Sequence, residues 1–126
     1  SRASSGADGE PEFSFILVGW GAGSGEASSP LKSLIHTHNP EMGMGASNRG
    51  RYSNPEVDAL IRQALATVDD AERQDLLAKA TEMAINDVAI IPLHYQVNTW
   101  ASRKELGYNA RTDEQTLATN VYTRGE

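Results

Sequence analysis

The chain has 126 residues, a formal net charge of −6 at neutral pH and a hydrophobic content of 39%. This length and composition suffice for one modest domain with a hydrophobic core. The acidic excess and the lack of a Lys/Arg cluster argue against a nucleic-acid partner, whose phosphates require concentrated positive charge. No run of about 18 apolar residues occurs, so no stable membrane insertion is expected. Without cysteine, the chain has neither a disulfide nor a thiolate for catalysis or zinc binding.

The amino-terminal third contains one strand pattern and one glycine-rich stretch. Residues 1–12 are mostly small and polar, and we expect a flexible lead-in there. The apolar, aromatic and β-branched run from Phe13 to Val18 predicts a central strand buried on both faces. It is followed by Gly19 to Gly25, where glycine occupies every second position, so we expect a loop whose backbone can approach another surface closely.

A short helix and a long loop are expected next. Ser28, Ser29 and Pro30 supply cap residues and a proline suited to the first helical turn, and apolar residues follow at helical spacing. The segment 39–51 is rich in Gly, Pro, Asn and Ser, a composition that favours no regular structure. We therefore predict a loop there that is either mobile or supported from outside.

The clearest signal predicts a helical hairpin over residues 54–88. Asn54 is a suitable N-cap, Pro55 suits the first helical position, and Asp69 stands three residues before Glu72, a capping-box spacing that starts a second helix. Each helix carries one apolar stripe. The stripes consist of Val57, Leu60, Ile61, Ala64, Leu65 and Val68, and of Leu76, Leu77, Ala80, Met83, Ala84 and Val88. On the first helix, Asp58, Arg62 and Gln63 are expected to face water.

The last third predicts a strand and a tail. Residues 89–101 begin with a β-type run interrupted by Pro92, which favours a strand start or an edge. The alternation that follows places His94, Gln96 and Asn98 on one polar face and Tyr95 on the opposite face. Residues 102–126 contain few core residues and are predicted to form an extended tail.

Patterns for catalysis or cofactor binding are largely missing. The glycines at 19–25 do not fit the Gly-x-Gly-x-x-Gly spacing, and Gly23-Ser24-Gly25 is not the Gly-x-Ser-x-Gly elbow of hydrolases. His36 and His38, with Glu41 nearby, are the one histidine pair with metal-ligand spacing, yet loop histidines usually face solvent. We therefore expect no cofactor, no metal and no enzymatic activity.

Four stretches of sequence, taken together, resemble a known family. They are the run from Phe13 to Trp20, the run from Arg51 to Ile61, the run Asp69-Asp70-Ala71-Glu72-Arg73, and the run from Asp87 to Leu93. In this order they resemble the last quarter of family 5 extracytoplasmic solute-binding proteins, which serve ABC transporters for dipeptides, oligopeptides, nickel complexes and related solutes. The resemblance covers most of residues 13–100.

The resemblance implies a fold, a location and partners. It predicts that residues 13–126 form the carboxy-terminal portion of a two-lobed clamp of the periplasmic-binding-protein type II class, in which a solute is enclosed by hinge closure. The chain itself would be mixed α/β, with short strands, the helical hairpin 54–88, a return strand at 89–101 and the tail. The expected location is periplasmic or at the cell surface. A small peptide-like solute and the permease subunits of an ABC importer are the expected partners.

The resemblance also implies ligand-binding positions in the glycine loop. Trp20 is similar to a tryptophan that lines the ligand cleft, although a core tryptophan is the alternative interpretation. Gly21, Ala22 and Gly23 would shape the cleft with their backbone. Peptide binders of the family carry an aspartate, which pairs with the peptide amino terminus, where this chain has Gly23. Either Glu26 replaces that aspartate from a shifted loop, or the ligand lacks a free amino terminus.

The second group of implied ligand positions lies on the return strand. Gln96 and His94 are on the polar face, and Tyr95 is the aromatic residue nearest to the place where family members present a ligand-facing tyrosine. A solvent-exposed face is the alternative for this strand. Arg51 and Tyr52 either reach a ligand carboxylate or serve the start of the hairpin.

Two other function classes remain as alternatives. Apolar faces left uncovered would make the chain a protein-interaction domain that self-associates. A metal-dependent hydrolase is the last alternative, because no nucleophile with a base and no three-ligand set can be placed.

Overall fold

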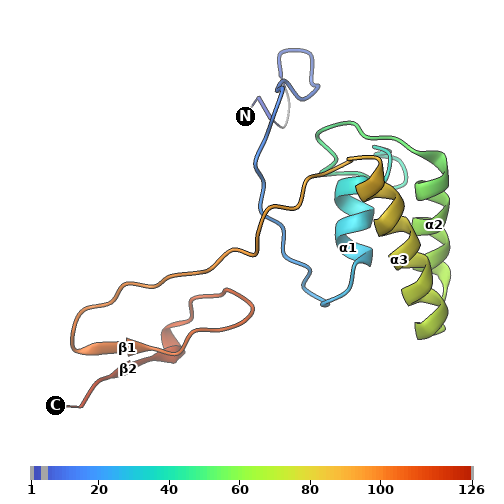
Figure 1. Cartoon of the computed structure of the whole chain (residues 1–126). Helices are drawn as coiled ribbons and strands as arrows, with labels where there is room; N and C mark the ends of the chain where they lie inside the picture. The colour runs from blue at the N-terminus through green and yellow to red at the C-terminus, as the bar shows by residue number, and fades with distance from the viewer. Residues whose placement is uncertain (1, 4–5, 126) are drawn as a thin grey trace. The chain divides into compact units, whose positions relative to one another are not determined.

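The computed structural model describes residues 2–3 and 6–125. The chain divides into two compact units, Ser1–Pro92 and Leu93–Glu126, and each is described by itself. Figure 1 shows helices in the first unit and a two-stranded sheet in the second. The described residues are thus mixed α/β, as the sequence predicts. None of their helices is long and apolar enough to cross a membrane.

The short helix begins two residues earlier than the predicted first helical position, Pro30. Helix α1 spans Ser28–Pro30 and continues into one π-helical turn, η1, at Leu31–Ile35. The N-cap is Ala27, which makes no side-chain cap hydrogen bond. The Ser28 hydroxyl donates to the Glu26 carboxylate instead of capping the helix. Leu31 and Ile35 are buried, which confirms the predicted apolar face.

The predicted hairpin is confirmed as α2, Pro55–Ala66, and α3, Asp70–Asn86. Asn54 Oδ1 accepts from the backbone N–H groups of Glu56 and Val57, and Asp69 accepts from that of Glu72. These side chains satisfy amides that the first helical turn leaves unpaired, so both helix starts are fixed by adjacent sequence. The two helices pack on each other, and α3 also contacts η1 while α2 contacts α1.

The core of the first unit lies where these elements meet. Its buried residues are Leu31, Ile35, Val57, Ile61, Ala64, Leu76, Leu77, Ala80 and Ala84. The stripes are shorter than predicted, since Leu65 is 42% exposed and Val68 and Val88 lie beyond the helix ends at 92% and 65% exposure. Asp58, predicted to face water, is only 7% exposed.

The loop between η1 and α2 is held by hydrogen bonds within the chain. The N–H groups of Gly45 and Ser47 donate to the carbonyls of Lys32 and Ser33 at 2.9 Å each. Gly45 has φ +62, and a Cβ there would collide with the backbone of His36 and His38. Its lack of a side chain therefore permits the loop to lie against the end of η1. Support comes from the neighbouring helix, not from outside the chain.

The two predicted long strands are absent among the described residues. Phe13 to Val18 and 89–101 have no strand assignment. Phe15 and Leu17 are 74% and 69% exposed, and Tyr95 and Val97 are 100% and 82% exposed. A strand requires a neighbour for its N–H and C=O groups, and neither run is paired with one. The prediction of strands at these positions is therefore wrong for this chain.

The tail predicted as extended contains a small hairpin in the second unit. Strand β1, Leu106–Tyr108, pairs antiparallel with β2, Val121–Thr123, after a 3₁₀ turn, η2, at Ala118–Asn120. Gly107 faces Tyr122, whose ring occupies the space that a Cβ would need. The strands have only three residues each, too few to produce a detectable alternation.

The lead-in predicted at 1–12 makes contacts where it is described. Arg2 pairs with Glu12 at 3.1 Å, and Glu10 pairs with Arg51 at 2.6 Å. Positions 1, 4 and 5 of the lead-in lie outside the described residues. Its flexibility stays a prediction.

Candidate functional site

The glycine loop after Trp20 is an open, exposed turn. Trp20 is 43% exposed, so it is not a core tryptophan in this chain. The Gly25 N–H donates to the Ala22 carbonyl at 2.9 Å, and Gly25 has φ +75, a value that favours glycine. A Cβ at Gly21 or Gly23 would meet open space. The described residues therefore provide no surface that these two glycines must approach.

Glu26 is already paired. Its carboxylate lies 3.3 Å from the guanidinium of Arg73 on α3 and also accepts from the Ser28 hydroxyl. The ion pair is partly exposed, and pairs of this kind contribute little to stability. It does, however, point the carboxylate of Glu26 at the helix. Among the described residues of the first unit, Glu26 is thus the one predicted ligand residue whose side chain has an identified partner.

A groove of about 930 Å³ runs between this loop and α3. Glu26 and Arg73 border it, Leu77 contributes apolar surface, and Thr81 and Glu82 continue the wall along the helix. A second, smaller groove of about 360 Å³ lies in the other unit, lined by residues that include Gln96 and Trp100. Each groove contains one or more residues predicted from the sequence.

The predicted ligand residues of the return strand belong to the second unit. His94, Tyr95 and Gln96 are all exposed, and the Gln96 amide donates to the Asn98 side chain at 3.0 Å. Without strand geometry, the alternation that would separate a polar from an apolar face does not hold here. One loop of the first unit contains Trp20, Gly21, Ala22, Gly23 and Glu26, and His94 to Gln96 belong to the second unit.

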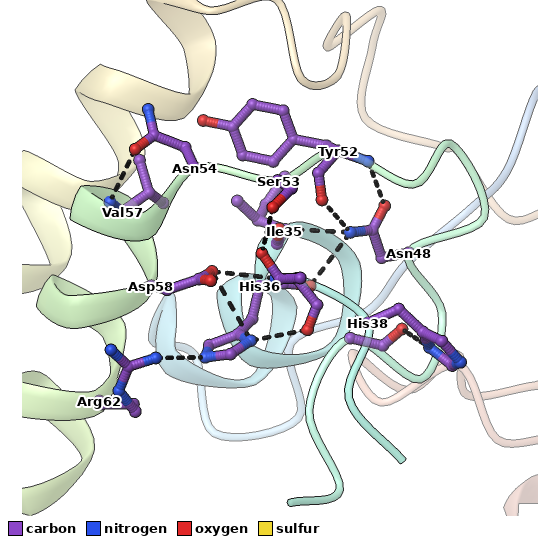
Figure 2. Close-up of polar contacts among 12 residues, drawn as sticks. Ile35, His36, His38, Asn48, Tyr52, Ser53, Asn54, Val57, Asp58 and Arg62 are labelled. Carbon is purple, nitrogen blue, oxygen red and sulfur yellow. Dashed lines mark hydrogen bonds and ion pairs between the residues drawn. The ribbon is translucent and has the colours of Figure 1, made fainter.

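A buried polar cluster centred on Asn48 was not predicted. The Asn48 amide is 3% exposed and donates to the carbonyls of His36 and Tyr52 at 3.0 and 2.7 Å, while its oxygen accepts from the Tyr52 N–H at 3.1 Å. Figure 2 shows this side chain between the end of η1 and the approach to α2. Asn48 replaces backbone partners that this irregular segment lacks. The only sequence signal was an Asn within a loop.

His36 is buried next to this cluster, with 2% exposure. Its Nε2 lies 3.2 Å from Arg62 Nη1, and its Nδ1 lies 2.8 Å from the Thr37 carbonyl and 3.6 Å from Asp58 Oδ1. Because a guanidinium can only donate, Nε2 accepts and Nδ1 carries the proton. The Thr37 N–H also donates to Asp58 at 2.9 Å, which explains why Asp58 is buried.

The His36–Asp58 pair does not form a catalytic arrangement. A general base needs a nucleophile on its free nitrogen, and here Arg62 occupies that position (Figure 2). The two histidines with metal-ligand spacing have different partners, since His38 Nδ1 lies 3.0 Å from the Gly45 carbonyl and His36 Nε2 lies 3.2 Å from Arg62 Nη1. In the described part of the chain, no group of three His, Cys, Asp or Glu side chains could hold a metal ion. The expectation that both histidines face solvent is wrong for His36.

Tyr52 and Asn54 meet at Asp87 after α3. The Tyr52 hydroxyl donates to Asp87 Oδ2 at 2.6 Å and the Asn54 amide at 2.7 Å. Burial, followed by the hydrogen bond to this carboxylate, raises the pKa of Tyr52 to about 12. The bonds from Tyr52 and Asn54 in turn lower the pKa of Asp87 below its usual value. Tyr52, just before the hairpin, thus has its hydrogen-bond partner within the chain, at Asp87.

Several known proteins with similar sequences are named as binding proteins. The periplasmic oligopeptide-binding protein OppA of Salmonella typhimurium is 33% identical over 86 residues, 68% of this chain and 14% of the relative. The glutathione-binding protein GsiB of Shigella dysenteriae is 34% identical over 72% of this chain and 17% of the relative. Heme-binding protein A of Haemophilus influenzae is 30% identical over 70% of this chain and 15% of the relative.

The chain belongs to the family 5 solute-binding proteins. It spans about 14% to 17% of the length of these three relatives. No family model and no solved structure matches the chain. Family membership therefore rests on sequence similarity to these relatives. The ligands in their names are oligopeptides, glutathione and heme, so family membership alone does not identify the solute.

Proposed function

We propose that the chain is part of the solute-binding subunit of an ABC importer that captures a small peptide-like or related solute outside the cytoplasm. The observation that carries this proposal is its similarity to relatives that are named as binding proteins and that differ in their ligands. The role is binding without chemistry, and the permease subunits of the importer are the macromolecular partners. The chain would supply the carboxy-terminal part of one lobe of the clamp.

Within this proposal, the glycine loop forms one wall of the solute site. Trp20 offers an exposed aromatic surface, and Gly21, Ala22 and Gly23 present backbone groups without bulky side chains. Aromatic and backbone groups of this kind are typical linings of solute pockets. His94, Tyr95 and Gln96 supply a second, polar set, and their exposure leaves them accessible to a ligand.

The contacts of Glu26 bear on the class of solute. Position 23 carries glycine, so the loop lacks the carboxylate that would meet a peptide amino terminus. The carboxylate of Glu26 is paired with Arg73 and Ser28, which disfavours its use as a substitute. A buried ammonium without a counter-charge is costly. The proposed solute is therefore a peptide-like molecule without a free amino terminus.

Isothermal titration with a free tripeptide and with its N-acetylated form tests this proposal. The protein used should be as long as its relatives, because in this proposal the 126-residue chain carries only part of the solute site. We expect the acetylated tripeptide to bind and the free one to bind more weakly. Tight binding of the free form alone, with no binding of the blocked form, would show that an amine-recognising carboxylate is present.

Substitution of Trp20 tests the location of the site. Trp20→Ala should weaken solute binding about tenfold, the factor that corresponds to a lost contact of about 1.4 kcal/mol. The matched control is Phe15→Ala, an exposed aromatic residue of the preceding segment. Equal solute affinities of the wild type and Trp20→Ala would show that Trp20 does not contact the solute.

Self-association is a second candidate function, favoured by the exposed apolar run before the glycine loop. Phe15, Leu17 and Val18 are 74%, 69% and 57% exposed. Apolar side chains exposed next to one another often mark a protein contact. Light scattering of the chain and of a Phe15→Ser, Leu17→Ser double variant separates the two functions. A dimer that the double variant abolishes would support an interaction domain, and a monomer at all concentrations would reject it.

A further inference from the structure

The end of α3 has an unusual combination of hydrogen bonds and backbone geometry. After Asp87, the Val88 N–H donates to the Ile85 carbonyl at 3.0 Å and the Ala89 N–H to the Ala84 carbonyl at 2.9 Å. This pair of bonds is the Schellman motif, in which the residue after the cap takes a left-handed conformation. The position that requires this conformation is Val88.

Val88 has φ +55, a conformation that a β-branched residue rarely adopts. Glycine is the usual residue at this position because it lacks the Cβ that clashes in the left-handed region. The Val88 side chain is 65% exposed, so burial of that side chain does not offset the strain. Something other than Val88 itself must hold this conformation.

The two neighbours of Val88 provide the restraint. Asp87 Oδ2 accepts from the Tyr52 hydroxyl at 2.6 Å and from the Asn54 amide at 2.7 Å, which ties the end of α3 to the start of α2. On the other side, Ala89 packs against the hydrophobic core. The backbone at Val88 is therefore held from both sides while its own preference opposes the observed geometry. Strain that the surroundings impose in this way often marks a point of conformational change.

We propose that Asp87, Tyr52 and Asn54 form a latch that keeps Val88 in its strained left-handed conformation. When the latch opens, Val88 relaxes to an extended conformation, the last two hydrogen bonds of α3 break, and residues 89–92 leave the helical hairpin in a new direction. The device has two states because Val88 favours one conformation and the latch favours the other. The segment 89–92 leads along the chain to His94, Tyr95 and Gln96, to which the proposed function assigns ligand binding, and any role of the latch in binding rests on that function.

Amide hydrogen exchange in the 126-residue chain tests the strain. In Val88→Gly, we expect exchange of the residue-88 and Ala89 amides to slow about tenfold, because glycine adopts the left-handed conformation with little strain. The matched control is Val68→Gly, the same substitution at an exposed valine after α2 that does not have positive φ. Since glycine there only adds freedom to the unfolded chain, its melting temperature should fall while that of Val88→Gly rises. Faster exchange in Val88→Gly, or a fall in melting temperature equal to that of the control, overturns the inference.

A second pair of variants tests the latch itself. Asp87→Ala removes the acceptor of both bonds and should speed exchange at Val88 and Ala89 about tenfold, with the middle of α2 unchanged. Asp75→Ala, at an exposed acidic position in the second turn of α3, is the matched control and should leave these two amides as they are. Equal rates in Asp87→Ala and Asp75→Ala would show that no latch exists. That result would leave the titration of Trp20→Ala unaffected, so failure of the latch and failure of the proposed function are distinguishable.

Discussion

The helical hairpin and the segment Phe13 to Val18 both carry clear apolar patterns, but only the hairpin forms its predicted structure. In α2 and α3 the stripes meet, and Val57, Ile61, Ala64 and Ala80 have at most 1% exposure. In Phe13 to Val18, the apolar side chains stay largely exposed and no strand forms. The amount of apolar surface does not explain this difference.

The difference lies in where the backbone hydrogen bonds must come from. A helix satisfies its N–H and C=O groups with its own residues and needs a neighbour only for its apolar face. The hairpin supplies that neighbour within about 30 residues. A strand needs another strand for both its hydrogen bonds and its burial. A sequence pattern typical of a central strand therefore leads to a strand only where other residues of the protein supply the neighbouring strands.

The largest expected effect separates these two regions directly. Ile61→Ala removes a fully buried side chain of α2 and should lower the free energy of unfolding by about 2–5 kcal/mol. The matched substitution in the exposed segment is Leu17→Ala, which should change it by no more than about 0.5 kcal/mol, because Leu17 is 69% exposed. Urea denaturation followed by circular dichroism measures both. A loss at Leu17 as large as that at Ile61 would mean that the segment packs against something in solution.

The loop between η1 and α2 is intermediate, since it is irregular yet held in place. Asn48→Ala should cost about 1–3 kcal/mol, because the carbonyls of His36 and Tyr52 and the Tyr52 N–H all lose their partner. Asn98→Ala, at a half-buried position of the otherwise exposed segment 93–101, is the control and should cost no more than about 0.5 kcal/mol. The same denaturation experiment measures both variants. Equal effects would show that the loop is no better anchored than the exposed segment.

The parts of the fold that the sequence predicts correctly are those determined by neighbouring residues. Asn54, Pro55 and Asp69 mark the helix starts because a cap acts over three residues. The helix ends are harder to predict from the sequence, because Val68 and Val88 continue the apolar spacing but lie beyond the last helical turns. The spacing of apolar residues alone does not show where the helical backbone ends.

The candidate site was predictable only in part. Trp20 and the glycines after it were found because they follow one another in the sequence, and the structure keeps them in one exposed loop. The burial of His36 and Asp58 depends on contacts between residues 21 to 26 positions apart, which no local pattern encodes. Their interpretation as solvent-facing groups was wrong for that reason.

The smallest expected effect concerns how the hairpin is closed at Asp87. Burial and the hydrogen bond to Asp87 raise the pKa of Tyr52 from 10.0 to about 12, and so the folded state favours the protonated hydroxyl. This contribution to stability is fully present below pH 10 and is lost as the pH rises through about 12. The pKa of Asp87 is lowered by the bonds from Tyr52 and Asn54, so its contribution is present above its usual pKa of 3.8 and is lost as the pH falls through the lower folded value.

A tyrosinate absorbance titration isolates Tyr52 from the other three tyrosines. The difference between the wild type and Tyr52→Phe should show one transition with a midpoint near pH 12, provided that circular dichroism shows the hairpin still folded there. Asp87→Asn removes the charge that holds the hydroxyl proton, so the midpoint should move down toward 10, while burial keeps part of the shift. The exposed segment contains Tyr95, and Tyr95→Phe serves as the control because this side chain is 100% exposed. A Tyr52 midpoint near 10 in the wild type would mean that the hydrogen bond between Tyr52 and Asp87 does not form in solution. The hydrophobic core alone would then hold the hairpin together, without an additional anchor after the last turn of α3.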